Sequence, residues 1–353
     1  MNPVRHRPYL RSRIGDALVA AGLMPILRPF HNRGRIPIVV LAYHRITPHE
    51  QEHSRINPFD SDLISATTED FEWQMRYLRD HFQVVPLTRL VSHLSGRDRI
   101  DRPTVIITFD DGFRDNYTYA YPILKELGIP ATIFLSTEMV DSREAIWFQM
   151  VSFLIMKSAP QSIQVEGIPE RLPRSNDPQI RRSDARMLQK HLKSLPHRKF
   201  QSTLTDLKTY MKIDNAHSDL DDLDDAVAIT WEQAREMQEN GIQFGSHTVT
   251  HGILSRMDQV EQQRELVQSK RRIEEALGKP VQAIAYPVGR FSSINDDVLY
   301  ETSCAGYRLG ACYESGVNWA TQLSPLCLLR QNVELSTTRS RFKAMVGLPN
   351  WIR

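Results

Sequence analysis

The feature that most constrains this chain is the alternation, from Ile36 onward, of short β-type apolar runs with longer stretches of helical periodicity. This order is typical of βα units, in which a helix connects each strand to the next parallel strand. The sequence therefore predicts an α/β body. The predicted strands are Ile36–Tyr43, Thr104–Phe109, Ala131–Leu135, Ile242–Gly245, Gln282–Tyr286 and Tyr307–Ala311, and the predicted helices are Glu69–Phe82, Arg114–Leu127, Trp231–Asn240 and Gln259–Leu277.

The composition is that of a folded globular protein with one large domain or two ordinary ones. Of the 353 residues, 41% are hydrophobic and 24% are charged, which excludes a disordered or fibrous chain. The formal net charge is only +2, so we expect no nucleic-acid partner, because such proteins carry a strongly basic surface. Three cysteines do not form a disulfide framework, which favours a reducing compartment.

Residues 1–35 form a basic extension that precedes the alternating pattern. Its arginines come before the apolar stretch Ala17–Leu27, in the order of a signal peptide. Pro25 interrupts this stretch, which is far shorter than the roughly 20 apolar residues that cross a bilayer. We predict an amphipathic basic helix, either packed on the body or in peripheral contact with a membrane, in a cytoplasmic protein.

Residues 141–228 break the alternation. They contain helical stretches at Ile146–Lys157, Asp184–Leu195 and His197–Met211, and they end in the acidic run Ser218–Ala226, which is typical of a solvated loop. We interpret this segment as a helical insertion within one catalytic domain that spans residues 36–347.

Two adjacent carboxylates, Asp110 and Asp111, directly follow the predicted strand Thr104–Phe109. Open α/β and barrel folds bind ligands at the carboxyl ends of their strands. Consecutive residues there point in different directions, so the two aspartates can serve different partners. The pair Asp221–Asp222 follows no such strand and indicates only a solvated loop.

Two histidines four residues apart, His247 and His251, follow the predicted strand Ile242–Gly245. Imidazoles at this spacing can bind one cation. The spacing alone is weak evidence, since His49 and His53 share it inside a polar loop that we interpret as surface. The position at a strand end distinguishes the first pair.

A third strand ends in a turn that contains Tyr286, Pro287 and Gly289. In order, Thr-Phe-Asp-Asp-Gly, His-x-x-x-His and Tyr-Pro-x-Gly resemble the polysaccharide deacetylases, the NodB-homology group known as carbohydrate esterase family four. The resemblance covers roughly residues 38–347 without the insertion. It implies a distorted (β/α) barrel of about seven parallel strands.

The resemblance also implies the chemistry. Hydrolysis of an acetamide needs a nucleophile, stabilisation of an oxyanion and a proton for the departing amine. By analogy with the family, Asp111, His247 and His251 would hold a divalent metal ion, and Asp110 would be the general base. Zinc suits these ligands. The implied substrate is an N-acetylated sugar of an exopolysaccharide or cell-envelope glycan or its precursor, with the turn at Tyr286, Pro287 and Gly289 in the substrate site.

The chain departs from the family pattern in its general acid. Many members carry a C-terminal Leu-x-His, but the last histidine here is His251. The strand that ends in Tyr43 and His44 resembles the N-terminal Tyr-His of the poly-N-acetylglucosamine deacetylase branch. We therefore hypothesise that His44 is the general acid; the alternative is a histidine that packs beside a strand end.

The third motif departs as well, because Tyr286 occupies the position of the arginine that orients the base in the family. Arg290 or Arg330 could supply this charge. Arg330 follows the apolar run Leu326–Leu329, so its guanidinium could enter the cluster and hold Asp110 ionised; the alternative is a surface arginine. Trp147 is a candidate wall of a sugar-binding groove, with a core position as its alternative.

Two other functions are compatible with the sequence. The same metal site could hydrolyse another non-peptide C–N bond in a small amide. The third hypothesis is a catalytically inactive glycan-binding or assembly protein. It is disfavoured because all four candidate site residues are present: Asp110, Asp111, His247 and His251.

Overall fold

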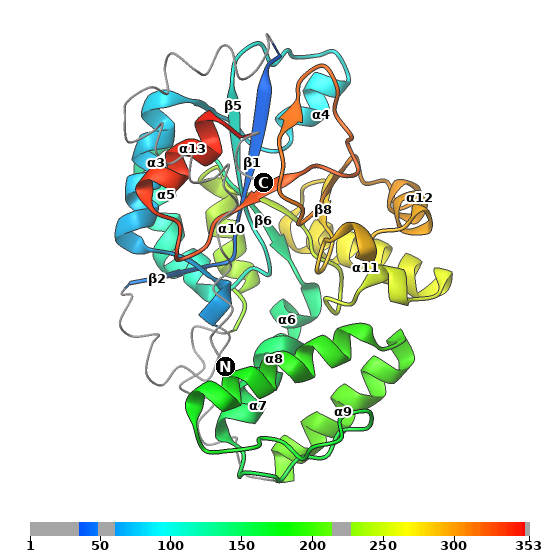
Figure 1. Ribbon diagram of the computed structural model, residues 1–353. Coiled ribbons are helices and arrows are strands. Elements are labelled where there is room, and N and C mark those ends of the chain that lie inside the picture. The colour runs from blue at the N-terminus through cyan, green and yellow to red at the C-terminus, as the bar shows by residue number, and fades with distance from the viewer. Residues whose placement is uncertain (1–34, 49–60, 214–226, 350–353) are drawn as a thin grey trace.

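The computed structural model describes residues 35–48, 61–213 and 227–349 (Figure 1). The predicted helix at Ala17–Leu27, the pair His49 and His53, and the acidic run Ser218–Ala226 lie outside the described residues. In the part of the chain that the structure describes, no helix is both long and apolar enough to cross a membrane.

Seven parallel strands form a nearly closed barrel at the centre of the molecule. The last strand pairs with the first, and Leu328 bridges Ala311 of the sixth strand, which brings the two edges of the sheet together. The predicted distorted (β/α) barrel is thereby confirmed. In barrel order the strands are β1 (Pro37–Tyr43), β5 (Thr104–Phe109), β6 (Thr132–Leu135), β7 (Gln243–Ser246), β8 (Ala283–Ala285), β9 (Leu309–Ala311) and β11 (Arg330–Asn332).

The strands at the centre of the sheet are buried on both faces. Every residue of β1 and β5 is buried, as expected for parallel strands that pack against a barrel interior on one side and helices on the other. All six predicted strands are present, with ends that differ by two residues at most. Short additional strands are β10 (Asn318–Trp319) and β4 (Gln83–Val84) at the barrel and the separate pair β2 (Arg45–Thr47) and β3 (Ile64–Thr67).

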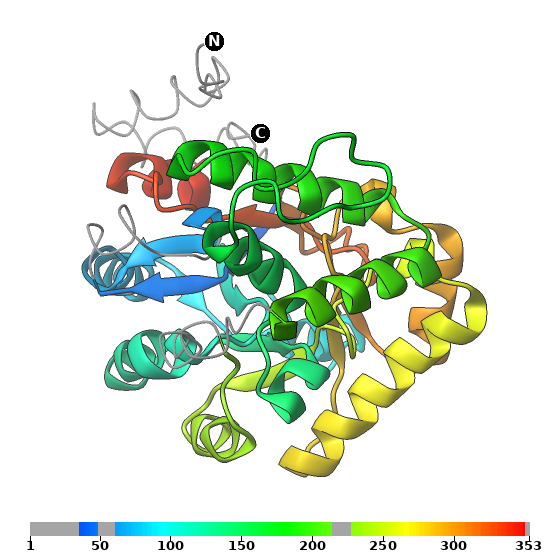
Figure 2. The ribbon, with the colours of Figure 1, turned by 90° about the horizontal axis from the view of Figure 1, so that it is seen from below.

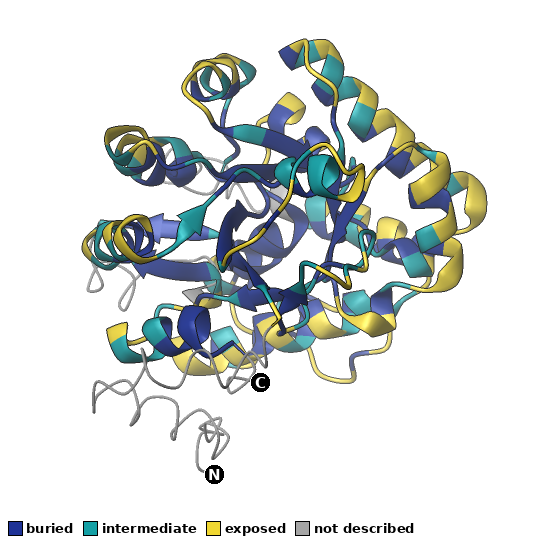
Figure 3. Cartoon of the chain, turned by 90° about the horizontal axis from the view of Figure 1, so that it is seen from above, coloured by how far each residue is buried: buried dark blue, intermediate teal, exposed yellow. Residues whose placement is uncertain are grey.

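Helices surround the barrel, and their outward faces are exposed (Figure 3). Their ends follow sequence signals: Thr230 and Gln233 form a capping box, and Gly128 ends a helix in the left-handed conformation, with φ of 63°. The helices are α3 (Thr68–His81), α4 (Arg89–Leu94), α5 (Tyr121–Leu127), which a π-helical turn at Asn116–Ala120 precedes, α6 (Thr137–Ser142), α10 (Trp231–Glu239), α11 (Gln259–Leu277), α12 (Asp296–Cys304) and α13 (Arg339–Gly347).

The predicted insertion forms a group of three helices at one end of the barrel (Figure 2). They are α7 (Trp147–Lys157), α8 (Pro178–Ser194) and α9 (His197–Ile213). The start of α8 differs most from the prediction, which placed it at Asp184. Asp177 caps the helix by accepting hydrogen bonds from two backbone N–H groups, and Pro178 occupies its first turn, a combination that marks helix starts.

Candidate metal and catalytic site

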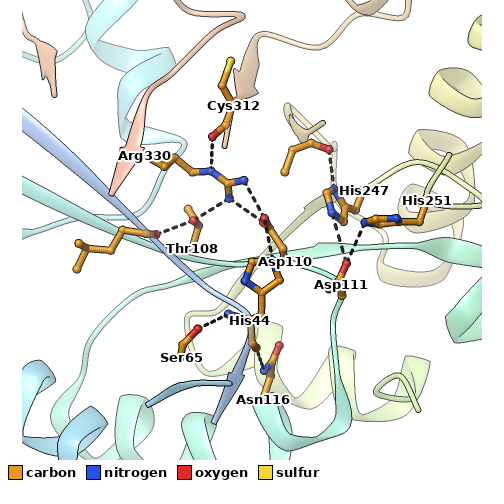
Figure 4. Close-up of polar contacts among 12 residues, drawn as sticks. His44, Ser65, Thr108, Asp110, Asp111, Asn116, His247, His251, Cys312 and Arg330 are labelled. Carbon is orange, nitrogen blue, oxygen red and sulfur yellow. Dashed lines mark hydrogen bonds and ion pairs between the residues drawn. The ribbon is translucent and has the colours of Figure 1, made fainter. Parts of the chain in front are cut away.

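The candidate site lies at the carboxyl ends of the barrel strands, on the side that faces the insertion. A cavity of about 270 Å³ opens there. The predicted residues His44, Asp110, Asp111, His247 and His251 all line it. They follow β1, β5 and β7, so strands far apart in the sequence bring them together (Figure 4).

Asp111, His247 and His251 converge on one point. Oδ1 of Asp111 lies 3.5 Å from Nε2 of His247 and 3.3 Å from Nε2 of His251. All three side chains are buried, and neither carboxylate oxygen of Asp111 has a hydrogen-bond partner among the described residues. Buried carboxylate oxygens are almost always paired. Two neutral imidazoles and one carboxylate are a donor set typical of zinc and similar divalent cations, so these residues fit a metal ion.

Backbone conformation directs these ligands inward. Asp111 and His251 both adopt positive φ, at 71° and 56°, which is uncommon for residues other than glycine and concentrates at functional sites. Gly112 follows Asp111 with φ of 75°, and a Cβ there would collide with Leu135. The loop after β5 therefore turns sharply where the two aspartates leave the strand.

Neighbouring groups fix the orientation of both imidazoles. Nδ1 of His247 donates a hydrogen bond of 2.7 Å to the carbonyl of Ala285, which leaves Nε2 unprotonated and directed at Asp111. The carboxylate of Glu265, fully buried on α11, accepts hydrogen bonds from the backbone N–H groups of Val249 and Thr250 between the two histidines. No sequence pattern predicts this position of Glu265, because a lone glutamate within a helical pattern carries no site signal.

Asp110 forms a buried ion pair with Arg330. Nη1 and Nη2 of the guanidinium lie 2.7 Å and 2.8 Å from the two carboxylate oxygens, and Nε donates to the carbonyl of Cys312 at 2.7 Å. Burial by itself would raise the pKa of Asp110, but the charge and hydrogen bonds of Arg330, together with the nearby imidazoles of His247 and His44, outweigh it and hold this pKa well below its usual range. Asp110 is therefore ionised and able to accept a proton.

The cation beside Asp110 is thus Arg330, as the sequence analysis suggested, while Arg290 pairs with Glu314 at 3.3 Å. Arg330 is fully buried, so it is not the surface arginine that was its alternative. It begins β11 and pairs with Val40 in the middle of β1, so it reaches Asp110 from inside the barrel.

His44 lies on the other side of Asp110. Its Nε2 is 3.9 Å from Oδ2 of Asp110, and its backbone N–H donates to Ser65 Oγ at 2.9 Å. The carbonyl of His44 accepts a hydrogen bond of 2.7 Å from Asn116. Burial lowers the pKa of His44 to about 4, against the opposing effect of Asp110, so the imidazole is neutral at neutral pH.

Of the three turn residues predicted for the substrate site, one lines the cavity and two do not. Tyr286 lines the cavity, although its hydroxyl donates to the carbonyl of Leu326 at 3.0 Å and it is almost completely buried. Pro287 and Gly289 do not line the cavity. Gly289 has φ of 60°, and a Cβ would meet the backbone of Tyr313, so this glycine shapes the turn.

Trp147 takes the core position that was its alternative, beside a neighbouring cavity of about 370 Å³ that it lines. It is buried, packs edge-on against Phe200, and does not line the metal cavity. Its indole N–H donates to the carbonyl of His251 at 3.4 Å. The next residue, Phe148, lines the cavity and lies edge-on to His251 at a ring separation of 5.1 Å. A one-residue step on a helix rotates the side chain by about 100°, which a pattern of consecutive apolar residues cannot resolve.

Comparison with known proteins decides the family. The model of the polysaccharide deacetylase family matches residues 97–168 and 185–310, more than half of the chain. The chain belongs to this family. A relative assigned by name to the polysaccharide deacetylases, YxkH of Bacillus subtilis, is 24% identical over 278 residues, which cover 78% of this chain and 64% of YxkH.

A second relative is the poly-β-1,6-N-acetyl-D-glucosamine N-deacetylase of Staphylococcus aureus. It is 29% identical over 118 residues, which cover 32% of this chain and 41% of the relative. The chain therefore spans less than two thirds of the length of either relative.

Solved structures support the same fold. The deacetylase PplD of Streptococcus pyogenes, in complex with acetate, superimposes with a TM-score of 0.57 at 21% identity, covering 90% of this chain and 99% of PplD. IcaB of Ammonifex degensii has a TM-score of 0.53 at 17% identity and covers 89% of this chain and 97% of IcaB.

The convergence of the three ligands predicts how metal content responds to substitution. We expect Asp111→Ala and His247→Ala to lose most bound divalent metal, because two remaining ligands hold a cation poorly. Elemental analysis of the purified variants measures this loss. His81→Ala, at an exposed histidine on α3, is the matched control and should keep the wild-type content; unchanged metal in both site variants would refute the assignment.

The Arg330–Asp110 pair predicts a large, pH-dependent effect on stability. Arg330→Met leaves a buried carboxylate without its partner and should lower the free energy of unfolding at pH 7 by about 3–5 kcal/mol. The folded pKa of Asp110 is depressed, so the contribution of the pair is present above the ordinary aspartate pKa of about 4 and is lost as the pH falls. The deficit of the variant should accordingly shrink in acid.

Urea denaturation at several pH values measures this effect. The double variant Arg330→Met with Asp110→Asn is the control, because it removes the stranded charge, and it should recover part of the lost stability. A single variant as stable as the wild type at pH 7 would contradict the prediction.

Proposed function

We propose that the protein is a metal-dependent hydrolase that removes N-acetyl groups from an N-acetylated sugar of an exopolysaccharide or cell-envelope glycan or its precursor. The observation that carries this proposal is the buried cluster of Asp111, His247 and His251 beside the ionised Asp110 in one cavity. Family membership and the N-deacetylase activity in the name of the staphylococcal relative support it.

The ligand set indicates which cation would bind and what it would supply. Asp111, His247 and His251 would hold zinc, which favours two imidazoles with one carboxylate and keeps positions open for water and substrate. When bound, the cation lowers the pKa of water and polarises the acetamide carbonyl.

Asp110 would be the general base. It is adjacent to Asp111 in the sequence, and its carboxylate faces the same cavity. Arg330 holds both oxygens at fixed positions and keeps the group ionised. Asp110 therefore accepts the proton of the attacking water at Oδ2, the oxygen that also faces His44.

His44 would protonate the departing amine. The imidazole is neutral at neutral pH, so the proton that it donates must reach it during the reaction. Nε2 of His44 lies 3.9 Å from Oδ2 of Asp110, and a small approach brings the two atoms within hydrogen-bond distance. We infer that one proton moves from water to Asp110, then to His44, and finally to the amine nitrogen.

The apolar side of the cavity suits the acetyl methyl group. Phe148 and Leu63 line it from α7 and from the turn before β3. Phe148 lies edge-on to His251. An apolar wall at this position would exclude water from one side of the scissile bond and strengthen electrostatic stabilisation of the developing oxyanion.

Acetate release tests the proposal. Purified protein reconstituted with zinc should release acetate from N-acetylglucosamine oligomers, and chelation should abolish the release. Asp110→Asn should lower kcat by about 10²–10⁴-fold while metal content is kept, because it removes the base and leaves the three proposed metal ligands in place; His81→Ala should match the wild type. If the protein hydrolyses small cyclic amides and no acetylated sugar, it is a hydrolase of another non-peptide C–N bond. If the metal-loaded protein hydrolyses neither, a glycan-binding protein is favoured.

The role of His44 has its own test. His44→Ala should lower kcat on an N-acetylated sugar by about 10²–10⁴-fold, because the amine then departs without a positioned acid. The same variant should keep much more of its activity on an aryl acetate, whose phenolate leaves without protonation. Equal losses on both substrates, or unchanged turnover of the sugar, would exclude His44 as the general acid.

A further inference from the structure

His44 lies where the chain passes from the barrel sheet to a second sheet. β1 ends at Tyr43, whose carbonyl accepts a hydrogen bond of 2.9 Å from the backbone N–H of Asp110. β2 begins at Arg45 and pairs with β3 in the separate sheet. His44 belongs to neither strand, so among the described residues its backbone groups find their partners outside the strand ladders.

Two buried side chains hold the backbone of His44 instead (Figure 4). Ser65 Oγ accepts from its N–H at 2.9 Å, and Nδ2 of Asn116 donates to its carbonyl at 2.7 Å. These bonds fix the two peptide groups that flank the residue. The imidazole can therefore move only by rotation about its own side-chain torsions.

Asp115 holds the next two residues in the same way. Its Oδ2 lies 2.7 Å from Nε of Arg45 in a buried ion pair, and its Oδ1 accepts from the backbone N–H of Ile46 at 3.3 Å. Oδ1 also accepts a hydrogen bond of 2.9 Å from Nδ2 of Asn116. Two adjacent side chains, which we call the Asp115–Asn116 clamp, thus bind three consecutive residues after β1.

The local backbone places the clamp beside the reacting groups. Asn116–Ala120 form a π-helical turn, and the clamp stands at its start. π turns are rare and frequently mark functional sites. The clamp also lies in the segment after β5 that carries Asp110 and Asp111, so one stretch of chain holds the candidate base, a candidate metal ligand and the partners of His44.

Packing alone does not account for Asn116. Its Nδ2 faces two acceptors, the carbonyl of His44 and Oδ1 of Asp115. Its own Oδ1 has no hydrogen-bond partner among the described residues. A buried amide oxygen without a partner lowers stability. The donors of this side chain are therefore what the site uses.

The held backbone gives the imidazole of His44 a defined place. The ring lies edge-on to Tyr313 at a separation of 5.4 Å, and Nε2 is 3.9 Å from Oδ2 of Asp110. A proton passes between these two atoms only when they approach to hydrogen-bond distance. A backbone shift of about 1 Å away from Asp110 would prevent that approach.

We propose that the Asp115–Asn116 clamp positions His44 for protonation of the departing amine, with Asn116 as the principal positioning residue. The inference rests on the proposed deacetylase function and on His44 as its acid. Neither clamp residue lines the cavity, so the clamp acts through His44 and not by contact with a substrate.

Two substrates test this inference with Asn116→Ala. Loss of the amide donor should lower kcat on N-acetylglucosamine oligomers by about 10–100-fold, the effect of a misplaced reacting group. Turnover of an aryl acetate, whose phenolate leaves without an acid, should change by less than about threefold. Metal content should be kept. Ser65→Ala, which removes the partner of the His44 N–H, should show the same selective loss and serves as the second variant if Asn116→Ala does not fold.

A double variant separates positioning from a general structural role. In a His44→Ala background, Asn116→Ala should change kcat on the sugar by less than about twofold, because residues that act as a unit are not additive. Gln243→Ala is the structural control. Its side-chain amide holds the backbone N–H of Thr88 at the amino end of β7, the opposite end of the barrel from the cavity, and its loss should leave the ratio of the two rates unchanged.

The possible failures are distinguishable. Unchanged turnover of the sugar by Asn116→Ala, equal losses on both substrates, or losses that multiply in the double variant would overturn this inference and leave the deacetylase function intact. No acetate from any acetylated sugar by the metal-loaded wild type would overturn the proposed function and this inference together.

Discussion

The buried ion pair between Arg330 and Asp110 is the interaction on which both the barrel and its chemistry depend. A buried charge is tolerated only when a partner and hydrogen bonds satisfy it, and here both carboxylate oxygens and three guanidinium nitrogens are paired. The pair joins β11, which closes the barrel, to the end of β5. Closure of the fold and ionisation of the candidate base therefore depend on the same contact.

The candidate metal ligands depend on a second set of constraints. Asp111 and His251 adopt positive φ, a conformation that costs about 1–3 kcal/mol for each such residue. Rigid surroundings hold them there: Glu265 binds the loop between the histidines, and the carbonyl of Ala285 fixes the ring of His247. The barrel thus supplies a ligand geometry that a free loop would not keep.

The barrel and the insertion contribute different side chains to the candidate site. The barrel provides His44, Asp110 and the three candidate metal ligands, whereas α7 and α8 provide Phe148 and Lys193 to the lining of the same cavity. Because α7 also supports His251 through Trp147, the insertion is coupled to the metal ligands and does not merely cover them.

The sequence by itself determined six of the seven barrel strands, most ends of the predicted helices and the four candidate residues Asp110, Asp111, His247 and His251, because periodicity, caps and motifs are local signals. Only the tertiary structure decided that β11 closes the barrel, since its three polar residues show no strand pattern, and that Arg330 meets Asp110 across 220 residues of chain. It also decided that Phe148, and not Trp147, faces the cavity. Such choices depend on which distant surfaces pack together, and no local pattern contains that information.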